Sequence, residues 1–280
     1  MCSVLGVSRS GYYKWVQEKH KVNGYQQRRK ALLARIKWLY HDSKRIYGSP
    51  KITELLRQEG WRVSERLVGK LMNENGMRSC TSKKFRVCTT DSNHDNPIAP
   101  NWLSQKFSKV NAPNKVWVAD ITYIPCREGR MYLASVMDLH TRKIVGWQLS
   151  DRMTTELVLS ALEQAYETHQ PPGRVLHHSD RGSQYTSATY RLRLKQYKMR
   201  ASMSRKGNCY DNACIESFHS VLKKEFIYCT RFHTKEQAQQ EVFEYIELFY
   251  NRKRIHGSLG YLSPTRFEAN YYEQKRSNCS

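Results

Sequence analysis

The stretch K-V-W-V-A-D-I-T-Y-I-P, residues 115–125, decides the fold of this chain. Its apolar and β-branched residues are typical of a buried strand, and the acidic residue Asp120 interrupts them. After a turn at Glu128-Gly129, residues 131–139 and 143–149 predict two further strands with short links. The three strands predict an antiparallel meander with a carboxylate in its first strand.

The next segments alternate between helix and strand. A helix is expected from Thr154 to about His169, where Pro171-Pro172-Gly173 breaks it, and R-V-L-H-H-S-D (174–180) is a fourth strand ending at Asp180. A helix near 187–197 and a short strand at 199–203 follow. This is the element order of the ribonuclease-H-like fold. We therefore expect an α/β core with a mixed five-stranded sheet flanked by helices.

The first third of the chain is predicted to be helical. Ser8 in L-G-V-S-R-S-G-Y-Y-K-W (5–15) caps a short helix that resembles the tail of a helix-turn-helix, and residues 29–40 form an amphipathic helix. A second helix opens at Ser49-Pro50, and a third is capped by Ser64 and carries Arg66 and Lys70 as candidate DNA contacts. The same pattern also describes any small three-helix domain.

These patterns divide the chain into four parts. Residues 1–24 are a partial helix-turn-helix, residues 25–80 a helix-turn-helix-like DNA-binding domain and residues 81–112 a basic linker, expected to run along DNA. Residues 113–275 are the catalytic domain.

The charge is strongly positive and unevenly distributed. The chain has 47 Lys and Arg against 25 Asp and Glu, a net charge of +22. Residues 1–112 hold 22 of the basic and 8 of the acidic residues, so their net charge is +14 and that of the remainder is +8. Such an excess favours polyanionic partners, although a merely soluble basic surface is the alternative. The front of the chain is expected to hold the DNA.

Eight cysteines show neither C-x-x-C pairs nor zinc-finger spacing with histidine, so we expect reduced, structural thiols. The chain shows no signal peptide and no apolar run of about 20 residues that would cross a bilayer. We therefore expect a cytoplasmic protein associated with the nucleoid, and no membrane partner.

Three acidic residues in polar, aromatic-flanked contexts, Asp120, Asp180 and Glu216, predict metal-dependent chemistry on nucleic acid. Phosphoryl transfer of this kind uses two cations about 4 Å apart. Asp120 would bridge two Mg²⁺ ions per site, with Asp180 and Glu216 each completing one shell, and Mn²⁺ would substitute. Three clustered like charges are costly without metals, which makes a purely structural role a weak alternative.

Further candidates surround these acids. Lys223 follows Glu216 by seven residues, nearly two helical turns, so it shares that helix face and can reach a phosphate; a solvated lysine is the alternative. Asp211 or Asn212 is expected to cap this helix, with a role of Asp211 as a fourth metal ligand as the alternative. His177, His178 and His219 are left unassigned. Further DNA contacts are expected in the loop S-R-K-G-N-C-Y-D-N and just after Asp180: Arg205, Lys206, Asn208, Tyr210, Gln184 and Tyr185.

Several long motifs in order resemble the insertion-sequence transposases of the IS-three family, which are DDE recombinases related to retroviral integrases. They are Y-G-S-P-K-I-T-E-L-L (47–56), W-x-x-D-I-T-Y (117–123), H-S-D-R-G-S-Q-Y (178–185), N-x-Y-D-N-A-x-x-E-S-F-x-x-x-L-K-x-E (208–225) and Y-I-E-L-F-Y-N-R-K-R-I-H-G-S-L-G-Y-L-S-P (245–264). The resemblance implies a catalytic triad of Asp120, Asp180 and Glu216 with Lys223 as the associated basic residue. It also implies a product of a second reading frame, often fused to an upstream helix-turn-helix protein, and no structural zinc.

The expected function is that of a DNA transposase. It would bind terminal inverted repeats, cleave to expose a 3′-hydroxyl and use that hydroxyl for strand transfer, by the resemblance through a circular junction. Its partners would be transposon-end, junction and target DNA, further copies of itself as a dimer or larger assembly, and the upstream protein. A hydrolytic nuclease and a non-enzymatic DNA-binding protein are the alternatives. The helix at 245–250 should pack on the core, and the following N-R-K-R-I-H (251–256) either contacts DNA or is solvated.

Overall fold

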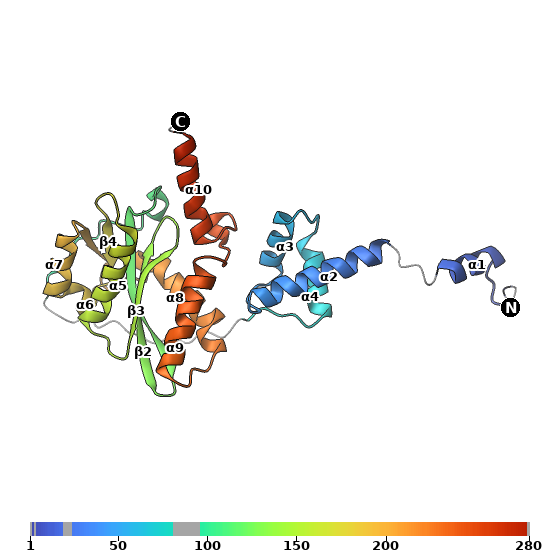
Figure 1. The fold of residues 1–280 in the computed structure, drawn as a ribbon, viewed down its shortest axis with the longest axis horizontal. Coiled ribbons are helices and arrows are strands. Elements are labelled where there is room, and N and C mark those ends of the chain that lie inside the picture. The colour runs from blue at the N-terminus through green and yellow to red at the C-terminus, as the bar shows by residue number, and fades with distance from the viewer. Residues whose placement is uncertain (1, 3, 19–23, 81–95, 279–280) are drawn as a thin grey trace. The chain divides into compact units, whose positions relative to one another are not determined.

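The computed structural model describes residue 2 and residues 4–18, 24–80 and 96–278. The chain divides into two compact units, Met1–Ser79 and Cys80–Ser280, and each is described by itself. Figure 1 shows a helical unit 1 and, in unit 2, a sheet with helices on both sides.

Unit 1 consists of α1 (Arg9–Glu18), α2 (Gly24–Asp42), α3 (Ser49–Gln58) and α4 (Glu65–Glu74). The apolar faces of these helices form the core of the unit, because Ile36, Ile52, Leu56 and Val68 are fully buried. Ser64 caps α4 as expected, since its Oγ accepts the amide of Leu67 at 3.3 Å. The helix expected over 29–40 is longer at both ends.

Unit 2 is built on a five-stranded mixed sheet in the order β3-β2-β1-β4-β5. The strands are β1 (Val116–Cys126), β2 (Gly129–Asp138), β3 (Ile144–Ser150), β4 (Leu176–Ser179) and β5 (Arg200–Met203). β1, β2 and β3 pair antiparallel, whereas β4 runs parallel to β1 and to β5. This arrangement confirms the predicted ribonuclease-H-like core.

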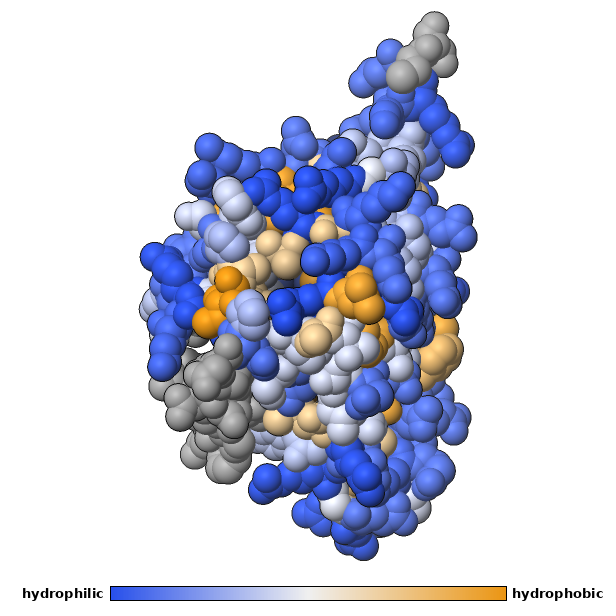
Figure 2. All heavy atoms as spheres, turned by 90° about the vertical axis from the view of Figure 1, so that its left-hand side faces the viewer, coloured by the Kyte–Doolittle hydropathy of each residue, from blue (hydrophilic) through white to orange (hydrophobic). Residues whose placement is uncertain are grey.

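The two faces of the sheet carry different helices (Figure 1). On one face, Trp117, Ala119 and Ile121 of β1 share a core with α5 (Thr155–His169), α6 (Ser183–Thr186) and α7 (Ala188–Gln196). The surface over α6 and α7 is mainly hydrophilic (Figure 2). α5 lies so close to β3 that a Cβ at Gly146 would collide with the carbonyl oxygen of Ala161. Since side chains alternate along a strand, Asp120 points to the other face, where α8 (Ala213–Glu225) and α9 (Lys235–Phe243) lie.

The C-terminal part packs on this second face. α9 continues into a π-helix, Glu244–Tyr250, which buries Tyr245, Ile246, Phe249 and Tyr250 as predicted. α10 (Pro264–Ser277) follows after a short 3-10 turn, Gly257–Leu259. Further 3-10 turns lie at Phe107–Lys109, Cys209–Asn212 and Ile227–Cys229. No helix among the described residues has the length and apolar character to cross a membrane.

Part of the segment expected as a linker is bound to the core. Residues 81–95 lie outside the described residues, but the amides of Trp102 and Leu103 both donate to Ser202 Oγ on β5, and Leu103 is 3% exposed. Residues 101–105 therefore belong to the packed structure of unit 2.

The expectation that the cysteines are reduced is wrong for one pair. Cys80 and Cys229, 149 residues apart, form a disulfide, whereas Cys2, Cys126 and Cys214 are free. The spacing of cysteines along the chain does not reveal a contact that only the fold creates.

Candidate active site

Asp120 and Asp180 lie side by side because of the strand register. The parallel pairing of β1 with β4 runs to Ala119 opposite Ser179, and each aspartate is the next residue of its chain. Asp120 Oδ1 accepts the amide of Ile121 at 2.9 Å, and Asp180 Oδ1 accepts the amide of Gly182 at 3.0 Å. These bonds leave the second oxygen of each carboxylate to other partners.

Glu216 joins the two aspartates from the first turn of α8. Partial burial, followed by the negative charges of Asp120 and Asp180, raises the pKa of Glu216 to about 7. A shift caused by both aspartates means that the three carboxylates lie within electrostatic reach of one another. The structure therefore brings the predicted acids, on β1, directly after β4 and on α8, within electrostatic reach of one another.

The donor chemistry of this cluster suits a hard divalent cation, because all three side chains offer carboxylate oxygens. Mutual repulsion among the acids is the penalty that a bound cation relieves. Over residues 4–18, 24–80 and 96–278, no group of three His, Cys, Asp or Glu side chains already has the spacing of a metal site.

Lys223 lies on the same side of α8 as predicted. Its ammonium group is 4.3 Å from the centre of the Tyr123 ring, a cation–π contact. Partial burial lowers the pKa of Lys223, while the attraction of Asp120 opposes this shift. A basic group therefore lies beside the acidic cluster.

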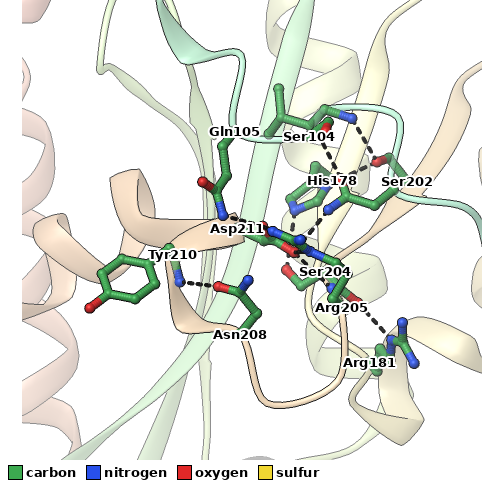
Figure 3. Close-up of polar contacts among 12 residues, drawn as sticks. Ser104, Gln105, His178, Arg181, Ser202, Ser204, Arg205, Asn208, Tyr210 and Asp211 are labelled. Carbon is green, nitrogen blue, oxygen red and sulfur yellow. Dashed lines mark hydrogen bonds and ion pairs between the residues drawn. The ribbon is translucent and has the colours of Figure 1, made fainter.

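The loop before α8 is organised around Asp211, which is fully buried (Figure 3). Its carboxylate accepts the backbone amide, Nε and Nη2 of Arg205 at 2.9–3.0 Å, and also the side-chain amides of Gln105 and Asn101 at 2.7 and 2.9 Å. Hydrogen bonds from Arg205 are the main reason that the pKa of Asp211 is far below its usual value. Asp211 thus joins the loop to the segment 101–105.

The predicted capping of α8 by Asp211 or Asn212 is wrong. Asn212 occupies the N-cap position, but its side chain makes no capping bond and instead donates to the carbonyl oxygen of Ala119 at 3.0 Å. Both side chains have longer-range partners, which the local sequence does not reveal. Asn212 fixes the start of α8 next to Asp120.

The other loop residues divide into engaged and exposed groups. Arg205 is ion-paired with Asp211, and Asn208 Oδ1 accepts the amide of Tyr210 at 3.0 Å. Lys206 is exposed, and the Tyr210 ring is 71% exposed and points away from the Asp211 cluster (Figure 3). Gly207 has φ +72°, the left-handed conformation that suits glycine.

Two predicted DNA contacts after Asp180 differ in accessibility. Gln184 is partly exposed and donates to the carbonyl oxygen of Met153 at 3.1 Å. Tyr185 is 2% exposed, so the expectation that it contacts DNA is wrong. Its ring packs on Tyr190 within the core.

The basic segment 251–256 was expected to contact DNA or to be solvated, but two of its residues, Asn251 and Arg254, are buried and have structural roles, whereas Arg252 and Lys253 are exposed. Arg254 is buried and donates to Glu225 at 2.6 and 2.7 Å, and Asn251 exchanges hydrogen bonds with the backbone of Ile144. In unit 1, by contrast, Arg66 and Lys70 line a surface hollow of α4.

His219, left unassigned above, contacts the candidate catalytic aspartate. Its Nδ1 lies 3.3 Å from Asp120 Oδ2, and its Nε2 lies 2.7 Å from Ser135 Oγ. The available sequence signal was the spacing of three residues from Glu216, which puts both side chains on one helix face. His177 and His178 are buried elsewhere, and burial lowers their pKa values to about 3 and about 4.

Comparisons with known proteins identify the family. The chain is 44% identical to the insertion element IS600 uncharacterized 31 kDa protein of Shigella sonnei over 98% of this chain and 99% of that protein. It is 41% identical to transposase InsF for insertion sequence IS3A of Escherichia coli (strain K12), over 96% of this chain and 92% of that protein. The chain belongs to the IS3 family of transposases.

Domain models agree with this family. An integrase core domain matches residues 110–209 and a second integrase core model matches residues 216–271, while an HTH-like domain matches residues 27–85. With these domains, this IS3-family transposase is a polynucleotidyl transferase with a DNA-binding helical domain.

Solved integrase cores are also similar. The HTLV-2 integrase catalytic core domain in complex with magnesium has 14% identity and a TM-score of 0.43, covering 56% of this chain and 97% of that one. The catalytic core domain of BIV integrase has 17% identity and a TM-score of 0.43, covering 58% and 99%.

Proposed function

We propose that this IS3-family transposase cleaves and joins the ends of its insertion element with Asp120, Asp180 and Glu216 as catalytic residues. The observation that supports this most directly is the register of β1 and β4, which makes Asp120 and Asp180 neighbours, together with the effect of both on the pKa of Glu216. Carboxylates arranged in this way have little reason to cluster except to bind cations.

The proposed cofactor is Mg²⁺, two ions per site, with Mn²⁺ as a substitute. Asp120 would hold both ions and Asp180 and Glu216 one each, and the ions would supply Lewis acidity and activation of the attacking oxygen. The chain's own residues position the DNA. Lys223 would bind a phosphate beside the cluster, and the exposed Tyr210 would stack on an unpaired base, with Lys206 on the adjoining backbone.

The proposed reaction has two phosphoryl-transfer steps. In the first, water attacks the phosphorus at the transposon end, the bond to the 3′-oxygen breaks, and that oxygen leaves as a hydroxyl. In the second, this 3′-hydroxyl attacks another phosphodiester: a new P–O bond forms, the bond to the 3′-oxygen of the attacked strand breaks, and that oxygen takes up a proton as the attacking hydroxyl loses its own. We propose that this first joins one end to the other as a circular junction, which then integrates into target DNA.

Recognition of the terminal inverted repeats is proposed for the HTH-like unit. Arg66 and Lys70 of α4 are the candidate duplex contacts, Lys70 having a long ion pair of 3.9 Å with Glu74. Arg205, Asn208 and Gln184 are weaker candidates near the site, because closer protein partners hold them. Two ends must be held together, so the active form would be a dimer or larger assembly. The upstream reading-frame protein is a further proposed partner, and the nucleoid in the cytoplasm the proposed location.

The decisive experiment is strand transfer with a pre-cleaved duplex that carries the inverted repeat of the element encoding this chain. Asp120→Asn is expected to bind this duplex with wild-type affinity and to lose joining by at least about a thousandfold, as losses of essential catalytic groups do. Release of cut strands without joining would instead indicate a hydrolytic nuclease. Equal products from wild type and variant would indicate a DNA-binding protein without this activity.

A further inference from the structure

Asp120 and Ser135 stand opposite each other in the β1–β2 pair. Directly opposed residues of antiparallel strands share a face of the sheet, with Cβ atoms about 5 Å apart. α8 covers this face, and its His219 reaches both residues. One imidazole ring therefore bridges two strands beside the first candidate carboxylate.

The two ring nitrogens face groups of different chemistry. Nδ1 lies 3.3 Å from Asp120 Oδ2, and Nε2 lies 2.7 Å from Ser135 Oγ. An ionised carboxylate only accepts hydrogen bonds, so a neutral imidazole must carry its proton on Nδ1 to bond with it. Nε2 then accepts the proton of the Ser135 hydroxyl. The serine thus favours the tautomer that Asp120 requires.

Burial distinguishes this arrangement from simple packing. Ser135 is 0% and His219 5% exposed, so water cannot replace a lost partner easily. An apolar ring would fill the same space beside Phe218, whose ring centre lies 5.4 Å from that of His219. Two polar contacts matched at opposite ends of the ring indicate that its orientation matters.

We propose that His219 is a positioning residue that orients the Asp120 carboxylate for cation binding, with Ser135 holding the imidazole in place. This inference rests on the proposed function, because it takes Asp120 as a metal ligand. His219 binds no cation itself; its Nδ1 lies 3.3 Å from Oδ2 of Asp120 and would donate its proton there. Because Glu216 lies three residues earlier on α8, one helix places the third carboxylate and orients the first.

The test combines Mn²⁺ binding to the full-length transposase, measured by electron paramagnetic resonance, with the Mg²⁺ dependence of strand transfer. His219→Phe keeps a ring and removes both nitrogens, whereas His219→Asn and His219→Gln keep an amide near the Nδ1 and Nε2 positions, respectively. We expect His219→Phe and His219→Gln to weaken Mn²⁺ binding and to raise the half-saturating Mg²⁺ concentration by about tenfold or more, the usual effect of removing a partner of a metal ligand. His219→Asn should recover most of this loss, and Ser135→Ala should show a smaller loss.

The matched control is His177→Phe, which removes a buried histidine bonded to the Tyr190 hydroxyl at 3.0 Å. It should lower the thermal midpoint and leave both metal measurements unchanged. Wild-type Mn²⁺ affinity in His219→Phe overturns the proposal, whatever its effect on melting. If that variant does not fold, equal Mn²⁺ affinity in His219→Asn and His219→Gln overturns it.

Asp120→Asn separates this inference from the proposed function. If Asp120→Asn keeps Mn²⁺ binding and strand transfer, the assignment of the catalytic acids fails. If Asp120→Asn loses both Mn²⁺ binding and strand transfer while His219→Phe keeps both, only the positioning role of His219 fails.

Discussion

At the scale of single residues, the ionised form of Glu216 lowers the stability of the folded chain. Its pKa of about 7 is above the ordinary value of 4.5, so the unfolded chain ionises this group at lower pH than the folded chain does. Below about pH 4.5 the difference contributes nothing unfavourable. Between about pH 4.5 and 7 the unfolded chain ionises this group while the folded chain keeps it protonated, so the free energy of unfolding falls as the pH rises, and above pH 7 the loss is complete.

We therefore expect Glu216→Gln to increase the free energy of unfolding at pH 8 without divalent cations by about 1 kcal/mol, a figure reduced for solvent screening because the Glu216 side chain is only partly buried. The gain should be much smaller at pH 5. Guanidinium titrations in the presence of EDTA measure it. A variant that is equally stable to wild type at both pH values would contradict a raised pKa.

The catalytic candidates were predictable as single residues because each stands in a distinctive local motif. Asp120, Asp180 and Glu216 were predicted from such motifs, and the fold brings them together. The contact of His219 with Asp120 and Ser135 was not predictable, because it depends on which residue of β2 faces Asp120. A strand register is set by the whole sheet and its turns.

At the scale of elements, the start of α8 depends on one buried carboxylate. Asp211 accepts hydrogen bonds from Arg205 and from two side chains of the segment 101–105. Replacing it with an uncharged amide leaves these donors with a weaker acceptor.

We expect Asp211→Asn to lower the free energy of unfolding by about 2 kcal/mol, within the range for a lost charged hydrogen-bonding partner. Trypsin should then cleave faster after Arg205 and Lys206. Denaturant titration and timed proteolysis measure the two effects. Asp151→Asn is the control, since the Asp151 side chain is 54% exposed and its ion pair with Lys235 is 3.4 Å long. Similar effects of both substitutions would contradict the anchoring role of Asp211.

Helices and strands were predictable where a local apolar period determines them. The five strands follow from such patterns, and the N-cap Ser64 of α4 follows from its position just before the helix. The π-helix Glu244–Tyr250 was predicted only as a helix, because its wider turn leaves no distinct apolar period. The capping residues of α8 were predicted wrongly, because Asp211 bonds to residues more than 100 positions away.

At the scale of the whole molecule, the net charge of +22 determines how the protein meets DNA. Neutralising phosphates releases counterions, so affinity for a duplex should fall steeply with salt. Arg66→Ala and Lys70→Ala should each reduce the slope of log K against log[salt] by about one. Fluorescence anisotropy between about 50 and 200 mM salt measures this slope.

Lys37→Ala is the control for these substitutions, because Lys37 is exposed on α2 of the same unit. An equal change of slope in Lys37→Ala would show that α4 has no special part in binding. The uneven charge and the fold class were visible in composition and motif order. The covalent cross-link was not, because cysteine spacing contains no information about distance in the folded chain.

That cross-link has a topological consequence. By joining Cys80 to Cys229, it closes a ring of backbone that threads through all five strands and contains Asp120, Asp180 and Glu216. A reductant breaks only the S–S bond and leaves the covalent structure of the acidic cluster unchanged. Oxidised and reduced preparations are therefore two polymers of different connectivity, and melting curves of variants are comparable only when the thiol state of the sample is fixed.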